Sequence, residues 1–272
     1  MRTRTIVAVG FAVTATGAVL AVTAAAGSIT PPPNIKQAGK IVYCTDATYP
    51  PEELFQGGKI VGSDIDFGTE IGKLMGVKAQ FKNTTFDSII AALLTKKCDA
   101  VISGMNDTLE RRKSVDFVDY LKVGQSLMVK KGNPEHITTL ASLSGKRVSV
   151  ESGTTNRDFL VATSKTLVKQ GKKAITIVTF PKDTDAFAAL KAGRVDAYFA
   201  DAPPVARYAK LDPSVEVGGH PINPFPIGIA IRKGDPLRAA TQSAINMLYA
   251  NWTMKRIVAK WGMSDAVVLL KK

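Results

Sequence analysis

Small polar residues follow four short apolar runs whose composition is typical of β-strands. They are Asp46 and Tyr49, Gly104 and Asn106, the consecutive residues Gly153, Thr154 and Thr155, and Asp201. Ligands of α/β proteins bind outside the carboxyl ends of the strands. These residues are therefore the first candidates for a binding site, and their hydroxyls, amides and carboxylates suit a small polar ligand.

An arginine lies just beyond the second of these groups, where a turn begins. The run from Thr108 to Arg111 resembles a helix start with Thr108 as its cap. Free backbone amides at such a turn favour an anion, and Arg111 can add two parallel hydrogen bonds to a carboxylate. The alternative is a solvated Arg111 beside Glu110 and Arg112.

The remaining candidates complement a carboxylate clamp. The turn 153–155 offers amides and hydroxyls to an anion, or simply caps the helix that follows. Asp201 can accept an ammonium group, or only begin a turn before Pro203. Tyr49 and Phe86 can form an aromatic slot, although Phe86 also suits a core. A clamp, an ammonium acceptor and an apolar slot are together what a free α-amino acid requires.

Strand-like and helix-like segments alternate along the chain from residue 40. A first series has strands at 41–44, 78–81 and 100–102 and helices at 64–75 and 86–97. A second series has strands at 125–129, 147–151, 175–180 and 197–200 and helices at 156–169 and 184–192, and the chain closes with a strand at 227–231 and helices at 236–250 and 253–261. Such alternation predicts parallel strands with crossover helices. Because each series is too short for a large sheet alone, the sequence predicts two α/β lobes.

The composition excludes several classes of protein. The chain has 272 residues and a formal net charge of +13, but its basic residues are scattered and not interleaved with aromatic ones. We therefore expect no nucleic acid partner. The two histidines lie far apart in sequence, and neither a phosphate-binding loop nor a dinucleotide-binding glycine pattern occurs, so we expect no metal and no cofactor. Cys44 and Cys98 are either paired or two buried free thiols.

The first 26 residues have the pattern of a secretory signal. Arg2 and Arg4 precede an apolar stretch, and small residues at 24–26 suit cleavage near residue 26. We expect an exported protein with a stiff, structureless leader at 27–39. A retained N-terminal membrane anchor is the alternative.

Five ordered runs resemble the polar amino acid-binding proteins of ABC importers. They are TDATYPP (45–51), GKIVGSDID (58–66), SGMNDTLERRKSVDF (103–117), ESGTT (151–155) and AGRVDAYFADAP (192–203). The resemblance extends from about residue 40 to the C-terminus. It implies a two-lobed, periplasmic-binding-protein-like fold of type II with two crossing hinge segments. Lobe 1 would comprise residues 36–122 and 225–272, and lobe 2 residues 123–224.

The resemblance also implies roles for the candidates. Arg111 would pair with the α-carboxylate of the ligand, assisted by Asn106 and by the turn 153–155. Gly104 would offer its carbonyl, and Asp201 its carboxylate, to the α-ammonium. Because these groups come from both lobes, ligand binding would drive closure.

Asp46, Tyr49 and Phe86 match positions that contact the ligand's side chain in the family. Glu52 stands where the family commonly has an aromatic residue, and Glu53 follows it. With Asp46, these acids would favour a cationic amino acid such as arginine, lysine or ornithine, unless both glutamates face water. The resemblance implies a monomer, periplasmic or at the cell surface, that delivers its ligand to an ABC permease.

Two other functions occur on related folds. Cyclohexadienyl dehydratases use a Glu shortly after a Gly-Gly-Thr-Asn turn as a proton donor, but here Arg157 follows Asn156. An arginine cannot serve as that acid. A ligand-sensing receptor domain would need a downstream transmembrane helix, which the sequence to Lys272 does not contain. We therefore expect a binding protein without enzymatic activity.

Overall fold

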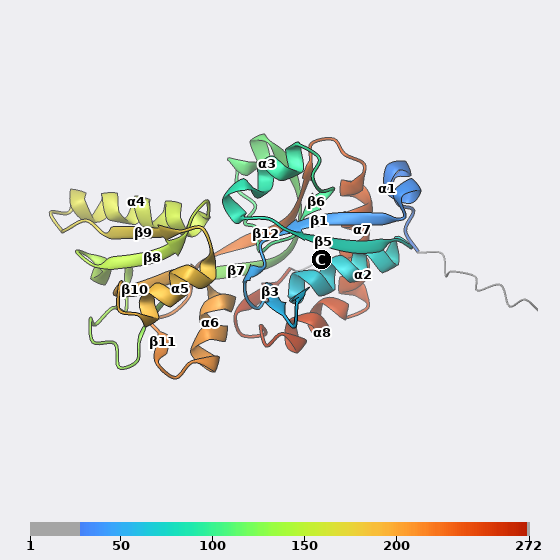
Figure 1. Ribbon diagram of the computed structural model, residues 1–272. Coiled ribbons are helices and arrows are strands. Elements are labelled where there is room, and N and C mark those ends of the chain that lie inside the picture. The colour runs from blue at the N-terminus through green and yellow to red at the C-terminus, as the bar shows by residue number, and fades with distance from the viewer. Residues whose placement is uncertain (1–27, 271–272) are drawn as a thin grey trace, which may run out of the picture.

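Two α/β lobes are joined by a pair of long strands in the computed structural model, which describes residues 28–270 (Figure 1). The strands β7 (Val115–Lys130) and β12 (Ile222–Arg232) are antiparallel to each other and belong to the sheets of both lobes. The predicted two-lobed fold of type II is thereby confirmed. The expected signal peptide at 1–26 lies outside the described residues.

Lobe 1 is built on β1 (Lys40–Thr45), which pairs in parallel with β5 (Lys78–Asn83) and β6 (Ala100–Val101). These strands confirm the first predicted series. The other elements of this lobe are α1 (Pro33–Ala38), α2 (Ser63–Leu74), η1 (Phe86–Ser88), α3 (Ile89–Leu94), η2 (Arg111–Lys113), α7 (Leu237–Ala250), α8 (Thr253–Lys260), β13 (Val267–Leu269) and a small sheet of β2 (Thr48–Tyr49), β3 (Glu53–Gln56) and β4 (Lys59–Val61).

Lobe 2 is built on β8 (Arg147–Glu151), which lies between β9 (Thr176–Phe180) and β10 (Ala197–Asp201), parallel to both. Through β10 this sheet joins β7 in antiparallel fashion. The other elements of this lobe are η3 (Leu140–Leu143), α4 (Thr155–Lys169), α5 (Asp183–Lys191), α6 (Ala202–Leu211) and β11 (Val215–Val217). The second predicted series is therefore also confirmed, although the strand expected at 125–129 is the end of the much longer β7.

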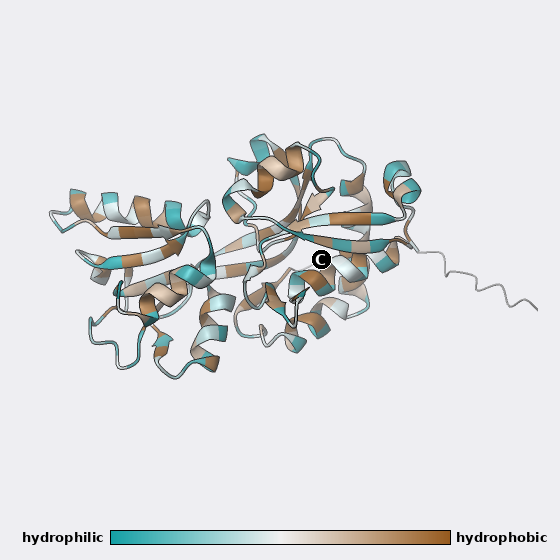
Figure 2. Cartoon of the chain, viewed as in Figure 1, coloured by the Kyte–Doolittle hydropathy of each residue, from teal (hydrophilic) through white to brown (hydrophobic). Residues whose placement is uncertain are grey.

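Each lobe has its own apolar core, formed where helices cover the sheet (Figure 2). In lobe 1, Ile41 on β1 and Phe67 on α2 pack with Ile229 on β12. In lobe 2, Val148 on β8 and Leu160 on α4 pack with Phe199 on β10. Separate cores make each lobe a unit that can move relative to the other. The lobe limits predicted near residues 122 and 225 stay a prediction, because β7 and β12 run through both sheets.

Two local expectations are wrong. The helix expected at 86–97 is a 3-10 turn followed by the short α3, which ends before Lys96, whose φ of 59° is left-handed. The expected structureless leader contains α1, which begins with Pro33 at its first turn and buries Ile35 in the core. Both segments are shaped by tertiary contacts that local sequence does not encode.

The open question of the cysteines is answered by a disulfide between Cys44 on β1 and Cys98 after α3. Both residues are buried in one apolar cluster with Val101 and Leu93. The bond ties α3 to the central strand of lobe 1, next to the turn that carries Asp46.

No helix within residues 28–270 is both long enough and apolar enough to span a membrane.

Candidate ligand-binding site

The strand ends of the two lobes face each other across the hinge and bring the predicted residues together. The turns after β1 and β6 come from lobe 1, and the turns after β8 and β10 come from lobe 2. They approach closely at Gly153, where φ is +74° and an added Cβ would lie 2.7 Å from the Cα of Asp87. Only glycine allows this backbone conformation and this approach at low cost.

Arg111 reaches from lobe 1 to lobe 2. Its Nη1 donates to the carbonyl of Asn106 at 2.8 Å, and its Nη2 donates to the carbonyl of Gly153 at 3.2 Å. The guanidinium carbon lies 5.4 Å from the centroid of the Phe86 ring. Burial lowers the pKa of Arg111 to about 10. An arginine that is half-buried, stacked and still charged fits the predicted carboxylate clamp better than the solvated alternative.

The turn that carries Arg111 is short and is fixed by Thr108. The hydroxyl of Thr108 accepts the backbone N–H of Arg111 at 3.1 Å, as the sequence predicts, but a 3-10 turn follows in place of a longer helix. The neighbouring Arg112 instead pairs with Asp107. Adjacent arginines therefore have different partners, one between the lobes and one on the outside of lobe 1.

Asn106 and Thr155 form a second bridge between the lobes. The hydroxyl of Thr155 donates to Oδ1 of Asn106 at 2.6 Å. The hydroxyl of Thr154, by contrast, caps α4 by accepting the N–H of Arg157 and donates to the carbonyl of Glu151. Thr154 therefore stabilises the turn, and Thr155 is the hydroxyl directed at the opposite lobe.

Asp201 lies at the end of β10, buried between Tyr49 and Asn156. Its backbone N–H donates to the Tyr49 hydroxyl at 3.1 Å, and its carboxylate accepts Nδ2 of Asn156 at 3.2 Å. It precedes α6, yet its side chain makes no capping hydrogen bond, so the simple turn-starting role is wrong. Burial raises the pKa of Asp201 to about 6, and the charge of Arg111 opposes that rise.

Asp46 supports the turn that carries it, and its predicted contact with the ligand's side chain stays a prediction. Its Oδ1 accepts the hydroxyl of Thr48 at 2.8 Å, and its Oδ2 accepts the backbone N–H of Phe86 at 2.7 Å. Both oxygens thus hold the turn and orient Phe86. Burial raises the pKa of Asp46. Its charge still reaches the space between the lobes, but its position is set by the backbone that it supports.

Glu52 and Glu53 do not face water, so the solvated alternative is wrong. Their exposed fractions are 1% and 0%. Oε2 of Glu52 has no hydrogen-bond partner among the described residues, and its Cγ would lie 3.8 Å from a Cβ added to Gly104. Burial, followed by the charge of Asp64, raises the pKa of Glu52 well above its usual range. Glu52 is therefore a buried acid beside the turn 103–106.

Glu151 is the functional candidate that the sequence analysis missed. It ends β8, is 3% exposed, and its Oε1 contacts no donor among residues 28–270. Burial raises its pKa well above the usual range, and the charges of Asp183, Asp46 and Asp201 raise it further. Glu151 is the first residue of the ESGTT run. Sequence alone does not distinguish a functional acid at this position from a polar residue that only ends a strand.

Together with Glu151, Asp183 forms an acidic wall in lobe 2. Its carboxylate accepts hydroxyls from Tyr198 and from Tyr208, and its backbone N–H donates to the hydroxyl of Thr48 in lobe 1 at 3.3 Å. Burial raises its pKa to about 7. Both oxygens of Asp183 already accept hydrogen bonds. Of the two acids of this wall, Glu151 is therefore the one with an oxygen that has no donor among the described residues.

A cavity of about 500 Å³ lies beside these residues on the side of the crossing strands. Asn106 and Thr155 contribute to its wall, as do residues of both connecting segments, and its full lining is Asn106, Thr108, Gln125, Thr155, Phe159, Asn223, Pro224 and Phe225. Arg111 and Asp201 do not belong to this lining.

A family profile for bacterial extracellular solute-binding proteins, family 3, matches residues 41–264. The chain belongs to this family.

Individual relatives in this family are amino acid-binding proteins. The L-cystine-binding protein TcyJ of Escherichia coli (strain K12) is 32% identical over 241 residues, which cover 85% of each chain. The ABC transporter arginine-binding protein 1 of the same organism is 32% identical over 231 residues, covering 82% of this chain and 91% of that protein. A solved structure of an ancestral arginine-binding protein bound to arginine has a TM-score of 0.76 and 38% identity, covering 82% of this chain and 98% of that one.

Proposed function

We propose that this protein captures a cationic amino acid outside the cytoplasm, between its two closing lobes, for delivery to an ABC importer. The observation that carries the proposal is that Arg111 of lobe 1 bonds to Gly153 of lobe 2 and that its charge acts on the buried carboxyl of Asp201 in lobe 2. Its likeness to proteins named for binding arginine and cystine supports an amino acid ligand.

Each group of an α-amino acid has a complementary partner in this arrangement. Arg111, with Asn106 and Thr155, suits the α-carboxylate, because its guanidinium fork matches two carboxylate oxygens. Asp201 suits the α-ammonium, with the carbonyl of Gly104 as a second acceptor. Tyr49 and Phe86 flank the aliphatic part of the ligand.

The acidic wall supports a positive charge at the ligand's distal end. After burial, the charges of Asp183, Asp46 and Asp201 raise the pKa of Glu151, and those of Asp46 and Asp201 raise the pKa of Asp183. A neutral ligand would leave this repulsion in place, whereas a guanidinium or ammonium group would relieve it and supply Glu151 with a donor. Arginine, lysine and ornithine are the ligands of this class.

Closure of the lobes follows from the same contacts. Four residues of lobe 1 bond across to lobe 2, namely Thr48, Tyr49, Asn106 and Arg111. A ligand that bonds both lobes adds to these contacts only in the closed form and therefore shifts the population toward it.

An enzyme of the dehydratase type is not favoured by the residues present. Arg157, which follows the turn 153–156 where those enzymes have their proton donor nearby, is half-exposed and pairs with Asp158. Membership of a solute-binding family agrees with a binding role. We propose a monomer, exported as its periplasmic relatives are, with the permease as its membrane partner.

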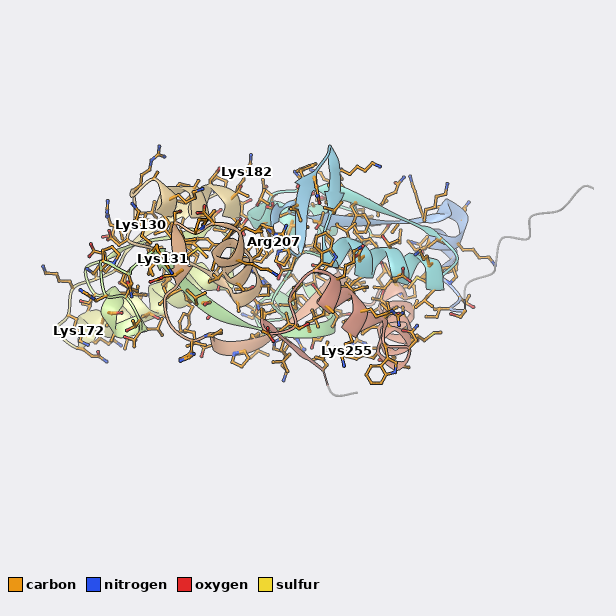
Figure 3. All side chains as sticks on the ribbon, turned by 90° about the horizontal axis from the view of Figure 1, so that it is seen from below. Lys130, Lys131, Lys172, Lys182, Arg207 and Lys255 are labelled. Carbon is orange, nitrogen blue, oxygen red and sulfur yellow. A yellow bond between two sulfur atoms is a disulfide. The ribbon has the colours of Figure 1, made fainter. Side chains whose placement is uncertain are left out.

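The charge distribution suits that role. Buried acids such as Asp46, Glu151 and Asp201 lie at strand ends where the lobes meet. Basic side chains are distributed over both lobes, among them the labelled Lys130, Lys131, Lys172, Lys182, Arg207 and Lys255 in Figure 3. An acidic interior attracts a cationic ligand at short range, because the outer charges are screened within about 10 Å in salt.

The affinity for the ligand is expected to fall in acid. The ammonium group binds the ionised form of Asp201, whose pKa is raised to about 6, so a bound proton must leave first. The dissociation constant of L-arginine should therefore rise about tenfold per pH unit as the pH falls below 6. Calorimetric titrations from pH 4.5 to 8 measure this, and Asp201→Asn should bind more weakly without that slope.

Thermal unfolding with each amino acid in turn tests the function itself. A ligand at about 100 times its dissociation constant adds about 2.7 kcal/mol and shifts the midpoint by several degrees. Arginine, lysine or ornithine should give the largest shift. A shift confined to a neutral amino acid contradicts the cationic class, and no shift with any amino acid contradicts the proposed function.

A further inference from the structure

A buried pair of acids lies beneath the two turns of lobe 1 that carry candidate ligand-binding residues. Glu53 on β3 and Asp64 in the first turn of α2 are both fully buried. Their hydrogen-bond partners among the described residues, Ser103, Gly104 and Tyr120, all belong to lobe 1. Their contacts lead to the turns after β1 and β6.

Asp64 holds the turn 103–106. Its Oδ2 accepts the backbone N–H of Gly104 at 2.8 Å, and both of its oxygens lie 2.8 Å from the hydroxyl of Tyr120. Gly104 has a left-handed φ of +49°, so its peptide is presented in a conformation that few residues adopt. The bond to Asp64 therefore fixes the position of the Gly104 N–H in this turn.

Glu53 holds the turn 45–49 through Ser103. Its Oε1 accepts the hydroxyl of Ser103 at 2.6 Å, and the oxygen of that hydroxyl accepts the backbone N–H of Asp46 at 2.9 Å. One serine thus connects Glu53 to both turns, since Ser103 itself begins the second one. A change in the position of Glu53 would move Asp46 and Gly104 together.

The second oxygen of Glu53 requires a proton. Oε2 of Glu53 is buried and contacts no donor among the described residues, while the Glu53 side chain hydrogen-bonds that of Asp64. Two carboxylates cannot hydrogen-bond each other, so one of them must be protonated. Burial and the charge of Asp64 raise the pKa of Glu53 well above its usual range, which makes it the protonated member.

The surroundings of the pair favour retention of this proton. The other titratable groups that face it are Glu52, Asp46 and Tyr120, on β3, the turn after β1 and β7. All three are acids, so each is either neutral or negatively charged, and none of them can neutralise an ionised pair. Loss of the shared proton would leave two carboxylates in contact without a counter-charge.

We propose that Glu53 and Asp64 are positioning residues which share one proton, and that this proton holds the turns 45–49 and 103–106 in the ligand-binding arrangement. The inference rests on the proposed function, because those turns carry Asp46, Tyr49, Gly104 and Asn106. Above the pH at which the proton leaves, both turns shift and ligand affinity falls.

Infrared spectroscopy of the unliganded protein tests the proton directly. A protonated carboxyl has a C=O stretch well separated from the carboxylate bands. The difference spectrum between the wild type and Glu53→Gln at pH 7 should show loss of a protonated carboxyl. Loss of carboxylate bands alone overturns the proposal, whether or not any amino acid binds.

Binding of L-arginine between pH 7 and 10 tests the positioning role. Glu53→Gln replaces the proton by an amide that can donate to Asp64 at any pH. The wild type should therefore lose affinity relative to Glu53→Gln by up to about tenfold per pH unit once the proton leaves. The α-ammonium of the ligand titrates equally in both proteins and cancels in the ratio.

Two further variants complete the experiment. Glu70→Gln, at an exposed ion pair with Lys73, should follow the wild-type profile. Asp64→Asn removes an acceptor of Gly104 and Tyr120 and should weaken binding roughly tenfold at pH 7. Identical pH profiles for the wild type and Glu53→Gln overturn the inference. Failure of the wild type to bind any amino acid contradicts the proposed function, and the infrared result still decides the acid pair.

Discussion

Replacing Arg111 by alanine is expected to weaken binding of L-arginine by at least about a hundredfold. Hydrogen bonds to charged groups contribute about 1.5–3 kcal/mol each, and the guanidinium can direct two of them at one carboxylate. The variant also loses the bond from Arg111 to Gly153 that joins the lobes and the stacking on Phe86. Isothermal titration calorimetry measures the effect.

Arg157→Ala is the matched control for this loss. Arg157 lies two residues from Thr155, is half-exposed and pairs with Asp158. Because exposed ion pairs contribute little, this variant should bind within about threefold of the wild type. Equal losses in both variants would show that general positive charge, and not the clamp of Arg111, retains the ligand.

Replacing Glu151 by glutamine is expected to change which amino acid binds best. Glutamine keeps the shape of the side chain but removes the carboxylate, whose Oε1 has no hydrogen-bond donor among the described residues. The affinity for arginine should fall about ten- to a hundredfold. Citrulline, which resembles arginine but lacks its charge, should change by less than about threefold, because the new amide can bond its urea group.

The ratio of the two affinities separates specificity from damage to the fold. A distorted site would weaken arginine and citrulline together, whereas a lost charge acts on arginine alone. Glu135→Gln, at a surface ion pair with Lys146, should leave the ratio unchanged. An unchanged ratio in Glu151→Gln would assign the distal end of the ligand to other groups.

Much of the fold could be predicted from sequence because its elements are locally consistent. The strands β1, β5, β8, β9 and β10 are apolar runs ended by turn residues, and α2 and α4 have helical periodicity. The prediction of a helix at 86–97 is wrong because Asp46, 40 residues earlier, accepts the N–H of Phe86 and sets the start of the turn. Contacts between distant segments lie outside any local pattern.

Sequence predicts the role of a residue type that has one common function in binding sites. It does not predict the role of most acidic residues here, because buried acids can serve several functions. Arg111 of lobe 1 bonds to lobe 2 and its charge acts on Asp201 at the end of β10, so the fold brings near each other two residues that the sequence had singled out. The acids Asp46, Glu53 and Glu151 have roles set by burial and by their partners. Whether each one binds ligand, supports a turn or retains a proton depends on hydrogen bonds that only the folded chain reveals.

The affinity of L-arginine compared with three analogues, each lacking one group, tests the central claim most directly. Agmatine lacks the α-carboxylate, 5-guanidinopentanoic acid lacks the α-ammonium, and citrulline lacks the distal charge. If Arg111, Asp201 and Glu151 act as proposed, each analogue should bind at least about tenfold more weakly than arginine in calorimetric titration. Binding of agmatine as tight as that of arginine would contradict the carboxylate clamp, and with it the proposal that this protein grips a free amino acid between its lobes.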